Sequence, residues 1–229
     1  MTQTTPFDAM ATLGHADGPL VTADQVRSVR QEIQRFLLQY EFGLREVETK
    51  LSILRDEFLE LHDYNPIEHV SSRVKSPESL LRKVARKGID RDLATIRAHV
   101  TDIAGVRVTC AFVQDVHRLF ALLTRQDDIR VLQVKDYIAD PKPNGYQSLH
   151  AIIEIPVFLS TGTSAVPVEV QFRTVAMDFW ASLEHRIYYK YDADVPERLT
   201  EELREAAQTA AELDARMARL HQQIHGAEA

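Results

Sequence analysis

The stretch VPVEVQFR (166–173) decides the fold that this sequence predicts. Its valines and its phenylalanine alternate with other residues, which is typical of a strand with one face in a hydrophobic core. The same alternation places Glu169, Gln171 and Arg173 together on the opposite face. From the sequence alone, that polar face is either a solvent-exposed surface or one wall of a cleft. A helix is predicted directly after the strand, from Thr174 to Tyr191.

Three segments upstream of this strand are also rich in Val, Ile and Phe, which predicts further strands. They are AGVRVTCAFV (104–113), VLQVKDYI (131–138) and LHAIIEIPVF (149–158). A helix is predicted between the first two, from Asp115 to Arg125. Strands and helices that alternate in this way predict an α/β core.

Long helices are predicted on both sides of this core. Apolar residues recur in alternating steps of four and three from about Asp24 to Asn65-Pro66, and again after Pro196. Each series forms an apolar stripe along its helix, here called a seam. We expect both seams to pack within one subunit, and the alternative is a seam shared between subunits. The predicted organisation is a flexible tail, an N-terminal helical arm, a core and a C-terminal helical arm, at residues 1–22, 23–66, 67–191 and 192–229.

Composition excludes several classes of protein. The 229 residues carry a net charge of −7, which argues against a generally basic nucleic-acid binder. The single cysteine, Cys110, cannot form an internal disulfide and fits a reducing compartment. No apolar run has the length of a membrane span, and the first residues do not resemble a secretion signal. We therefore expect a cytoplasmic protein that does not bind membranes.

The charge is unevenly distributed, because residues 71–91, here called the basic segment, hold seven basic and only two acidic residues. Ser76 and Pro77 predict the start of a helix within it, and Gly88 predicts its end. Ser79, Lys83 and neighbouring arginines share one helix face. Cations on a helix face near its N-terminus suit a polyphosphate, whereas the alternative is a solvated basic face.

Two carboxylates come next as candidates for metal chemistry. Asp102 directly precedes one predicted strand, and Glu169 lies within another. Each carboxylate also has an explanation that involves no metal, since Asp102 can cap a turn and Glu169 can face solvent. Carboxylates from two neighbouring strands are also what Mg²⁺ uses when it holds substrate phosphates at the same time. A bound Mg²⁺ would then neutralise charge during phosphoryl-type transfer.

The loop KDYIADPKPNGYQSLH (135–150) is the third candidate. Its Asn144-Gly145 pair predicts a turn that projects Tyr146, close to the other polar side chains of the loop. A tyrosine in such a loop can stack on a base for about 1–3 kcal/mol, and a nearby Lys or His can contact phosphates. The alternative is a plain hairpin between two strands.

Together these segments resemble the synthetase domain of the RelA/SpoT family, and in particular its small alarmone synthetases. The resemblance covers residues 73–190 through segments in the family's order and spacing. They are RVKSPESLLRKVARKG (73–88), DIAGVRV (102–108), DYIADPKPNGYQSLH (136–150), VEVQFRT (168–174) and AMDFWASLEHRIYYK (176–190). The family fold that the resemblance implies is a mixed five-stranded sheet with flanking helices, related to nucleotidyltransferases.

The resemblance implies transfer of pyrophosphate from ATP to the 3′-hydroxyl of GDP or GTP, giving the alarmones ppGpp or pppGpp. It implies that Asp102 and Glu169 bind Mg²⁺ and act in catalysis, with Glu169 placed to activate the 3′-hydroxyl. It implies an ATP site whose arginines enclose the adenine and whose other residues hold phosphates: Arg73, Arg107, Lys75, Ser79, Lys83 and Lys87. It implies a GDP/GTP site, with the tyrosine stacked on guanine, formed by Lys142, Asn144, Tyr146, Ser148, His150, Gln171 and Arg173.

The sequence departs from the long RelA/SpoT enzymes at Asp178, where those enzymes usually have His. We therefore assign Asp178 no catalytic role and leave it as a contact to GDP or GTP, the acceptor nucleotide. The resemblance also implies a homo-oligomer, with a tetramer formed through the terminal helices favoured. A nucleotidyltransferase on the same fold is one alternative, and a non-catalytic nucleotide- or RNA-binding regulator is another. The presence of both Asp102 and Glu169 argues against the regulator. RNA binding by the basic segment remains a secondary hypothesis without support of its own.

Overall fold

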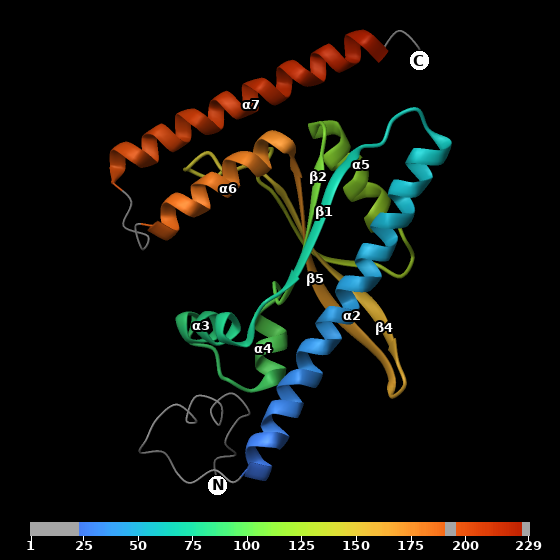
Figure 1. The fold of residues 1–229 in the computed structure, drawn as a ribbon, viewed down its shortest axis with the longest axis vertical. Coiled ribbons are helices and arrows are strands. Elements are labelled where there is room, and N and C mark those ends of the chain that lie inside the picture. Colours follow the sequence, from blue (N-terminus) through green and yellow to red (C-terminus); the bar gives the residue numbers. More distant parts are fainter. Residues whose placement is uncertain (1–22, 191–195, 226–229) are drawn as a thin grey trace.

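The computed structural model describes residues 23–190 and 196–225 (Figure 1). Its centre is a five-stranded sheet in the order β1-β2-β5-β4-β3. The strands are β1 (Ile67–Val74), β2 (Ala104–Cys110), β3 (Arg130–Asp136), β4 (Leu149–Leu159) and β5 (Gly162–Thr174). β2 and β5 are parallel, and the other neighbours are antiparallel. The predicted α/β fold with a mixed five-stranded sheet is confirmed, whereas the predicted tail, residues 1–22, lies outside the described residues.

The four predicted strands are all present, but β1 was not predicted as one. Its sequence, IEHVSSRV, has an exposed polar side chain at most positions and lacks the apolar alternation of a half-buried strand. It lies at the edge of the sheet, paired only with β2. An edge strand of this kind is held by backbone hydrogen bonds rather than by burial, which is why its sequence carries a weak signal.

Helix α2 (Ala23–Leu61) covers the apolar face of the sheet, and α5 (Val113–Thr124) packs on the same face (Figure 1). The prediction that the N-terminal seam packs within one subunit is confirmed by its burial. Gly43 lies at the closest approach, because a Cβ there would be only 2.7 Å from Cγ1 of Val166 on β5. The buried seam residues are Ile33, Tyr40, Leu44, Val47, Leu51, Leu54 and Phe58.

Helix α6 (Val175–Lys190) follows β5 directly, and α7 (Glu197–His225) packs against it. The prediction that the C-terminal seam packs within one subunit is wrong for its second half. The inward face of α7 includes Leu203, Ala207 and Asp214, and near the end of the helix His221 packs against the rings of Tyr64 and Phe112. The longer apolar side chains of the second half therefore point away from the rest of the chain. Those exposed side chains are Leu213, Met217, Leu220 and Ile224.

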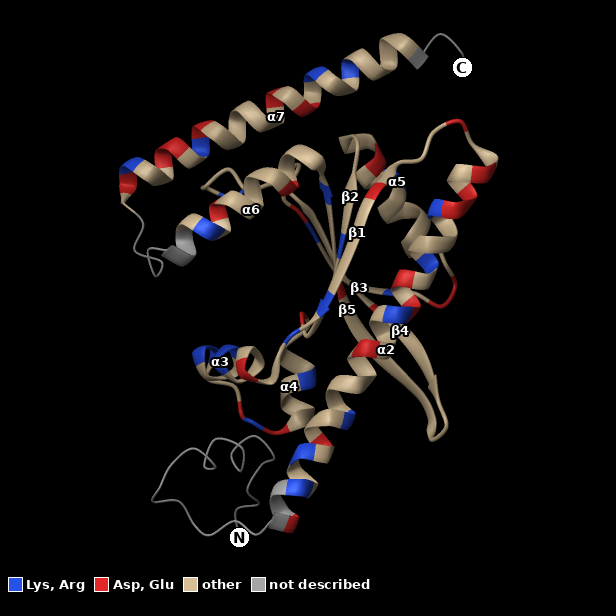
Figure 2. Cartoon of the chain, in the orientation of Figure 1, with Lys and Arg blue, Asp and Glu red and all other residues tan. Residues whose placement is uncertain are grey.

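The basic segment forms α3 (Pro77–Lys87), and α4 (Leu93–His99), which was not predicted, follows it. The predicted ends of α3 are confirmed, since Ser76 accepts a hydrogen bond from the Ser79 backbone N–H and Gly88 has a φ of +62°. In the view of Figure 1, α3 and α6 lie on the opposite side of the sheet from α2. Figure 2 shows that the charged residues of α3 are mainly Lys and Arg, whereas both signs of charge occur along α7. No helix within residues 23–190 and 196–225 has the length and apolar character needed to cross a membrane.

Candidate nucleotide site

The face of the sheet opposite α2 carries a row of polar side chains. The parallel register pairs Gly105 with Glu169 and Arg107 with Gln171, and the β4–β5 register pairs His150 with Gln171. Paired residues point to the same face of a sheet, so these side chains are neighbours in space. The alternation in VPVEVQFR that predicted a polar face is therefore confirmed, and that face is one wall of a pocket.

The pocket has a volume of about 200 Å³ and opens at the junction of β1, β2 and β5. It brings together both arginines predicted to enclose an adenine, Arg73 and Arg107, with both predicted metal ligands, Asp102 and Glu169. Ser71, Ser72, Gly105, Val106 and Gln171 complete its lining. Residues from three distant parts of the sequence thus converge at one place, whereas the other residues predicted for ATP do not line this pocket: Lys75, Ser79, Lys83 and Lys87.

Asp102 is held by two lysines of the basic segment. Its Oδ2 atom lies 2.5 Å from Nζ of Lys83 and 3.3 Å from Nζ of Lys75. Its Oδ1 atom is buried and has no hydrogen-bond partner among the described residues. Burial alone would raise the pKa of the Asp102 carboxyl, but the Lys83 hydrogen bond and the charges of both lysines hold this pKa below its usual value. Asp102 is therefore an ionised carboxylate with one oxygen left free for a ligand.

Glu169 is also ionised, and each of its two carboxylate oxygens has a polar partner that fixes its orientation. Oε1 lies 3.2 Å from Nδ1 of His150, and Oε2 accepts a hydrogen bond of 2.9 Å from Nε2 of Gln171. Burial raises the pKa of Glu169, but the His150 and Gln171 hydrogen bonds outweigh it and the pKa is lowered. The negative charge of Asp102 acts in the opposite direction on the same pKa, and both carboxylates line the same pocket.

These two carboxylates fit a Mg²⁺ ion that is shared with a phosphate ligand. Mg²⁺ takes one or two protein carboxylates and completes its octahedron with phosphate oxygens and water. The free Oδ1 of Asp102 and the mutual repulsion with Glu169 both favour a cation at this position. In the part of the chain that the structure describes, no group of three or more His, Cys, Asp or Glu residues could hold a metal ion, so an all-protein metal cage is not formed there.

A second element of the site is the connection between β3 and β4, here called the Tyr146 loop (residues 137–148). Its turn is closed by a hydrogen bond of 2.8 Å from the Gly145 N–H to the Lys142 carbonyl. The Tyr146 N–H donates to Oδ1 of Asn144 over 3.2 Å, and Gly145 has a φ of +87°. The predicted Asn-Gly turn is confirmed, and it presents Tyr146 towards the polar face of the sheet.

Tyr146 is connected to Glu169 through His150. The Tyr146 hydroxyl accepts a hydrogen bond of 2.7 Å from Arg173 and lies 2.7 Å from Nε2 of His150, whose Nδ1 faces Glu169. These contacts form one continuous chain if His150 carries its proton on Nδ1. Arg173 then donates to the Tyr146 hydroxyl, the hydroxyl donates to Nε2 of His150, and Nδ1–H of His150 donates to Glu169. The Lys142 ammonium lies 4.6 Å from the Tyr146 ring centre and the Arg173 guanidinium 5.2 Å from it. Cations therefore occupy the surroundings of the ring where a base would stack.

Three predicted ligands have other partners in the structure. Ser148 is fully buried, and its hydroxyl donates to the Phe172 carbonyl over 3.0 Å. The Asn144 amide donates to Glu184 on α6 over 3.0 Å. Lys87 is exposed at the end of α3, where its ammonium lies 3.3 Å from the carbonyl oxygen of His99. Ser148 and Asn144 therefore hold the Tyr146 loop in place and do not face the pocket.

Sequence reasoning missed the role of Asp178 in balancing charge. Its Oδ1 lies 3.1 Å from Arg107 and 3.0 Å from Arg173, so one carboxylate pairs with a guanidinium on each of the two central strands. Asp178 lies in the first turn of α6, which follows the strand that carries Arg173. That proximity in sequence is the signal that could have suggested the Arg173 pair, but the pairing with Arg107 depends on the parallel register.

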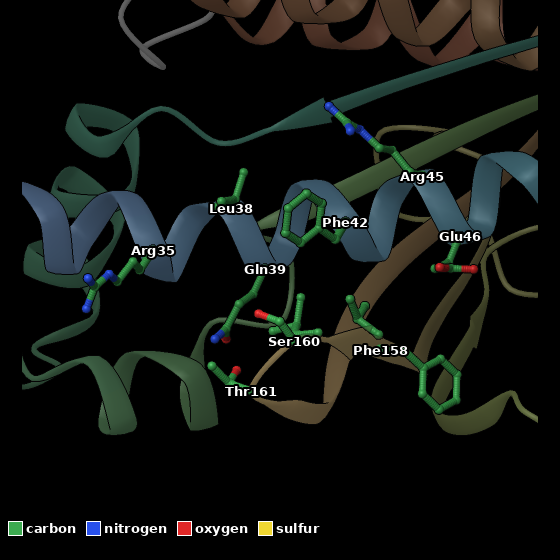
Figure 3. Close-up of a pocket in the computed structure, with 11 residues that line it drawn as sticks. Arg35, Leu38, Gln39, Phe42, Arg45, Glu46, Phe158, Ser160 and Thr161 are labelled. Carbon is green, nitrogen blue, oxygen red and sulfur yellow. The ribbon is translucent and has the colours of Figure 1, made fainter.

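A larger groove, of about 640 Å³, lies between α2 and the hairpin that joins β4 to β5 (Figure 3). Figure 3 shows Leu38, Phe42 and Phe158 around it, with Arg35 and Arg45 also on α2. None of the residues predicted to bind nucleotide lines this groove. The chemistry suggested by the sequence therefore belongs to the smaller pocket on the polar face.

Two arginines and two ionised carboxylates thus line one pocket on the polar face of the sheet, and the Tyr146 loop is linked to it through His150. The family described as "Region found in RelA / SpoT proteins" matches residues 72–194. The chain is 47% identical over 201 residues to GTP pyrophosphokinase YwaC of Bacillus subtilis, which covers 88% of this chain and 96% of that protein. It is 36% identical over 197 residues to GTP pyrophosphokinase YjbM of the same organism, with coverage of 86% and 92%.

Solved structures agree with this comparison. Small alarmone synthetase 2 from Bacillus subtilis aligns with a TM-score of 0.77 at 48% identity, covering 84% of this chain and 99% of that one. Small alarmone synthetase 1 from Bacillus subtilis, bound to its product pppGpp, aligns with a TM-score of 0.79 at 36% identity, covering 85% and 98%. This chain belongs to the RelA/SpoT family.

The Asp102 environment leads to a pH prediction. Because its folded-state pKa is lowered, ionised Asp102 stabilises the fold above its unfolded-state pKa, and this contribution is lost as the pH falls through the folded-state pKa. In Lys83→Met, burial remains but the strongest opposing hydrogen bond is removed, so the pKa of Asp102 rises. Carbon-13 NMR titration of the Asp102 carboxyl measures this shift. Lys87→Met is the matched control and leaves the Asp102 pKa unchanged, whereas an unchanged pKa in Lys83→Met would contradict the described ion pairs.

Proposed function

We propose that this protein transfers the pyrophosphoryl group of ATP to the 3′-hydroxyl of GDP or GTP, producing ppGpp or pppGpp. The observation that carries this proposal is the position of the ionised Asp102–Glu169 pair, between the basic segment on one side and the Tyr146 loop on the other. The names of the similar proteins support it, as does a solved structure of small alarmone synthetase 1 from Bacillus subtilis bound to AMPCPP, which aligns at 34% identity.

ATP would bind on the side of β1, β2 and α3. Arg73 and Arg107 would enclose the adenine, and the N-terminal half of α3 would receive the phosphates. The ammonium groups of Lys75 and Lys83 both pair with the single carboxylate of Asp102, which balances only one of their two positive charges. A triphosphate offers both lysines a stronger anionic partner, so its arrival would release Asp102 from them. Ser79 would add a hydroxyl on the same helix face, and Lys87 would contact the outer end of the phosphates.

GDP or GTP would bind on the side of the Tyr146 loop. Tyr146 would stack on guanine once Lys142 leaves the ring for a phosphate, and His150 would contact the acceptor nucleotide. Gln171 and Arg173 would hold Glu169 and Tyr146 in position through the hydrogen bonds that they already make. In this arrangement Asn144 and Ser148 serve the acceptor indirectly, by fixing the loop.

The two substrates would meet at the carboxylate pair. The 3′-oxygen of the acceptor attacks the β-phosphorus of ATP, the bond from that phosphorus to the α–β bridging oxygen breaks, and AMP leaves. Glu169 accepts the proton of the 3′-hydroxyl, for which its ionised state is required. Mg²⁺ held by Asp102 and Glu169 would supply neutralisation of the charge that develops on the phosphates.

Substitution of the carboxylates tests the reaction. Asp102→Asn and Glu169→Gln should each lower the rate of alarmone synthesis by about 100-fold or more, with little change in thermal stability. The assay mixes protein with ATP, GTP and Mg²⁺ and resolves the nucleotide products by anion-exchange chromatography. Asp63→Asn, an exposed carboxylate at the end of α2, is the control and keeps full activity. Full turnover by either site variant would exclude the metal assignment, and release of pyrophosphate instead of AMP would indicate nucleotidyl transfer.

Substitution of Tyr146 tests the acceptor side. Tyr146→Ala removes the stacking surface and should raise the KM for GTP roughly tenfold, in line with about 1–3 kcal/mol per stacked base, while the KM for ATP stays within about twofold. Tyr146→Phe keeps the ring and should have the smaller effect of the two. An unchanged KM for GTP in Tyr146→Ala would remove the stacking role.

We further propose a homo-oligomer, with the tetramer as the expected state. The exposed apolar side chains of α7 are spaced by four, three and four residues, which leaves a continuous helix face uncovered in the single chain. They are Leu213, Met217, Leu220 and Ile224. Light scattering of the purified protein tests this directly: we expect the mass of a tetramer, which Leu220→Glu lowers, and a monomer at micromolar concentration would contradict it.

A further inference from the structure

Helix α7 packs directly against the Tyr146 loop, although its sequence carries no group with obvious chemistry. A Cβ built on Gly145 would lie 2.5 Å from Cβ of Ala207, and 3.6 Å from the carbonyl oxygen of Arg204. The loop backbone therefore rests on the surface of α7, with no space for an additional methyl group at the contact. The positive φ of Gly145 excludes most other residues on the loop side, and the small side chain of Ala207 permits the approach from the helix side.

The same part of α7 also binds Trp180 of α6, the side chain that packs against Tyr146. The Trp180 Nε1–H donates a hydrogen bond of 2.8 Å to the Leu203 carbonyl, one turn before Ala207. Trp180, Leu203 and Ala207 are buried together, and Tyr146 packs against this cluster with its ring centre 6.4 Å from that of Trp180. Ala207 thus contacts the loop backbone and also belongs to the cluster behind the tyrosine ring.

A third contact fixes α7 to the strand that carries the other partners of Tyr146. The Thr174 hydroxyl donates a hydrogen bond of 2.5 Å to Oδ2 of Asp214, and both residues are buried. Thr174 directly follows Arg173, which donates to the Tyr146 hydroxyl. The position of α7 relative to β5 therefore determines where the loop rests relative to Arg173.

We propose that Ala207 is a positioning residue for the guanine nucleotide, through which α7 sets the location of Tyr146. This inference rests on the proposed function of the site. It is specific to the acceptor, because the residues proposed for ATP lie on β1, α3 and β2, whereas the contacts of α7 described above are with α6, β5 and the Tyr146 loop. A larger side chain at position 207 displaces the loop by the width of the added atoms, and a displacement of about 1 Å is enough to impair a reaction that depends on orientation.

Steady-state kinetics of Ala207→Leu tests the acceptor specificity. We expect the KM for GTP to rise roughly tenfold or more, while the KM for ATP stays within about twofold. Ala206→Leu is the matched control, because it adds the same side chain at the neighbouring, exposed position of α7. An equal rise of both KM values, or no rise in the KM for GTP, would overturn the proposal.

Hydrogen–deuterium exchange provides a second readout that needs no turnover. Wild-type Gly145 and Tyr146 amides are bonded to Lys142 and Asn144, and they should exchange at least severalfold faster in Ala207→Leu, while amides of β2 and β5 are unchanged. Trp180→Phe removes the hydrogen bond to Leu203 and part of the buried ring volume behind Tyr146, and it should show the same change to a smaller extent, so it serves if Ala207→Leu does not fold. Unchanged loop exchange in the variants that fold would overturn the proposal.

A wild-type protein that makes no alarmone would refute the proposed function, and the exchange result would still decide whether α7 positions the loop.

Discussion

One carboxylate oxygen, Oδ2 of Asp102, accepts a hydrogen bond from Lys83 and forms an ion pair with Lys75, and the geometry of the site depends on this ion cluster. Lys75 follows the end of β1, Lys83 lies in the middle of α3, and Asp102 directly precedes β2. The cluster thereby fixes the basic helix beside the sheet. A partly buried charge is costly without a partner, so neither the lysines nor the carboxylate is stable in this position alone. The same groups are those that we propose a nucleotide and a cation use.

The second half of the site depends on hydrogen bonds that cross the central strands. Arg173 donates to the Tyr146 hydroxyl, the hydroxyl contacts His150, and His150 contacts Glu169. The Tyr146 loop and the Glu169 carboxylate are therefore linked by one chain of polar contacts. Because α7 contacts that loop at Gly145, a helix far from Asp102 in sequence becomes part of the geometry around Tyr146.

The sequence predicted the parts of the site that local periodicity determines. The alternation around Glu169 placed three polar side chains on one face, and Ser76 and Gly88 marked both ends of α3; the structure confirms each. The edge strand β1 was missed because most of its side chains face solvent and leave no apolar pattern. The steps of four and three in α7 identified an apolar face but could not show what covers it, and the structure leaves Leu213 and Met217 exposed. The partners of Ser148, Asn144 and Asp178 depend on tertiary contacts that no local pattern encodes.

We propose that ATP would take Lys75 and Lys83 away from Asp102 and that the freed carboxylate would join Glu169 at a divalent cation. A crystal structure of the protein with Mg²⁺ and a non-hydrolysable ATP analogue tests this directly. We expect both ammonium groups to lie on phosphate oxygens, and Asp102 and Glu169 to contact the ion. A bound nucleotide with Asp102 still paired to both lysines, and with no metal ion at the two carboxylates, would contradict it.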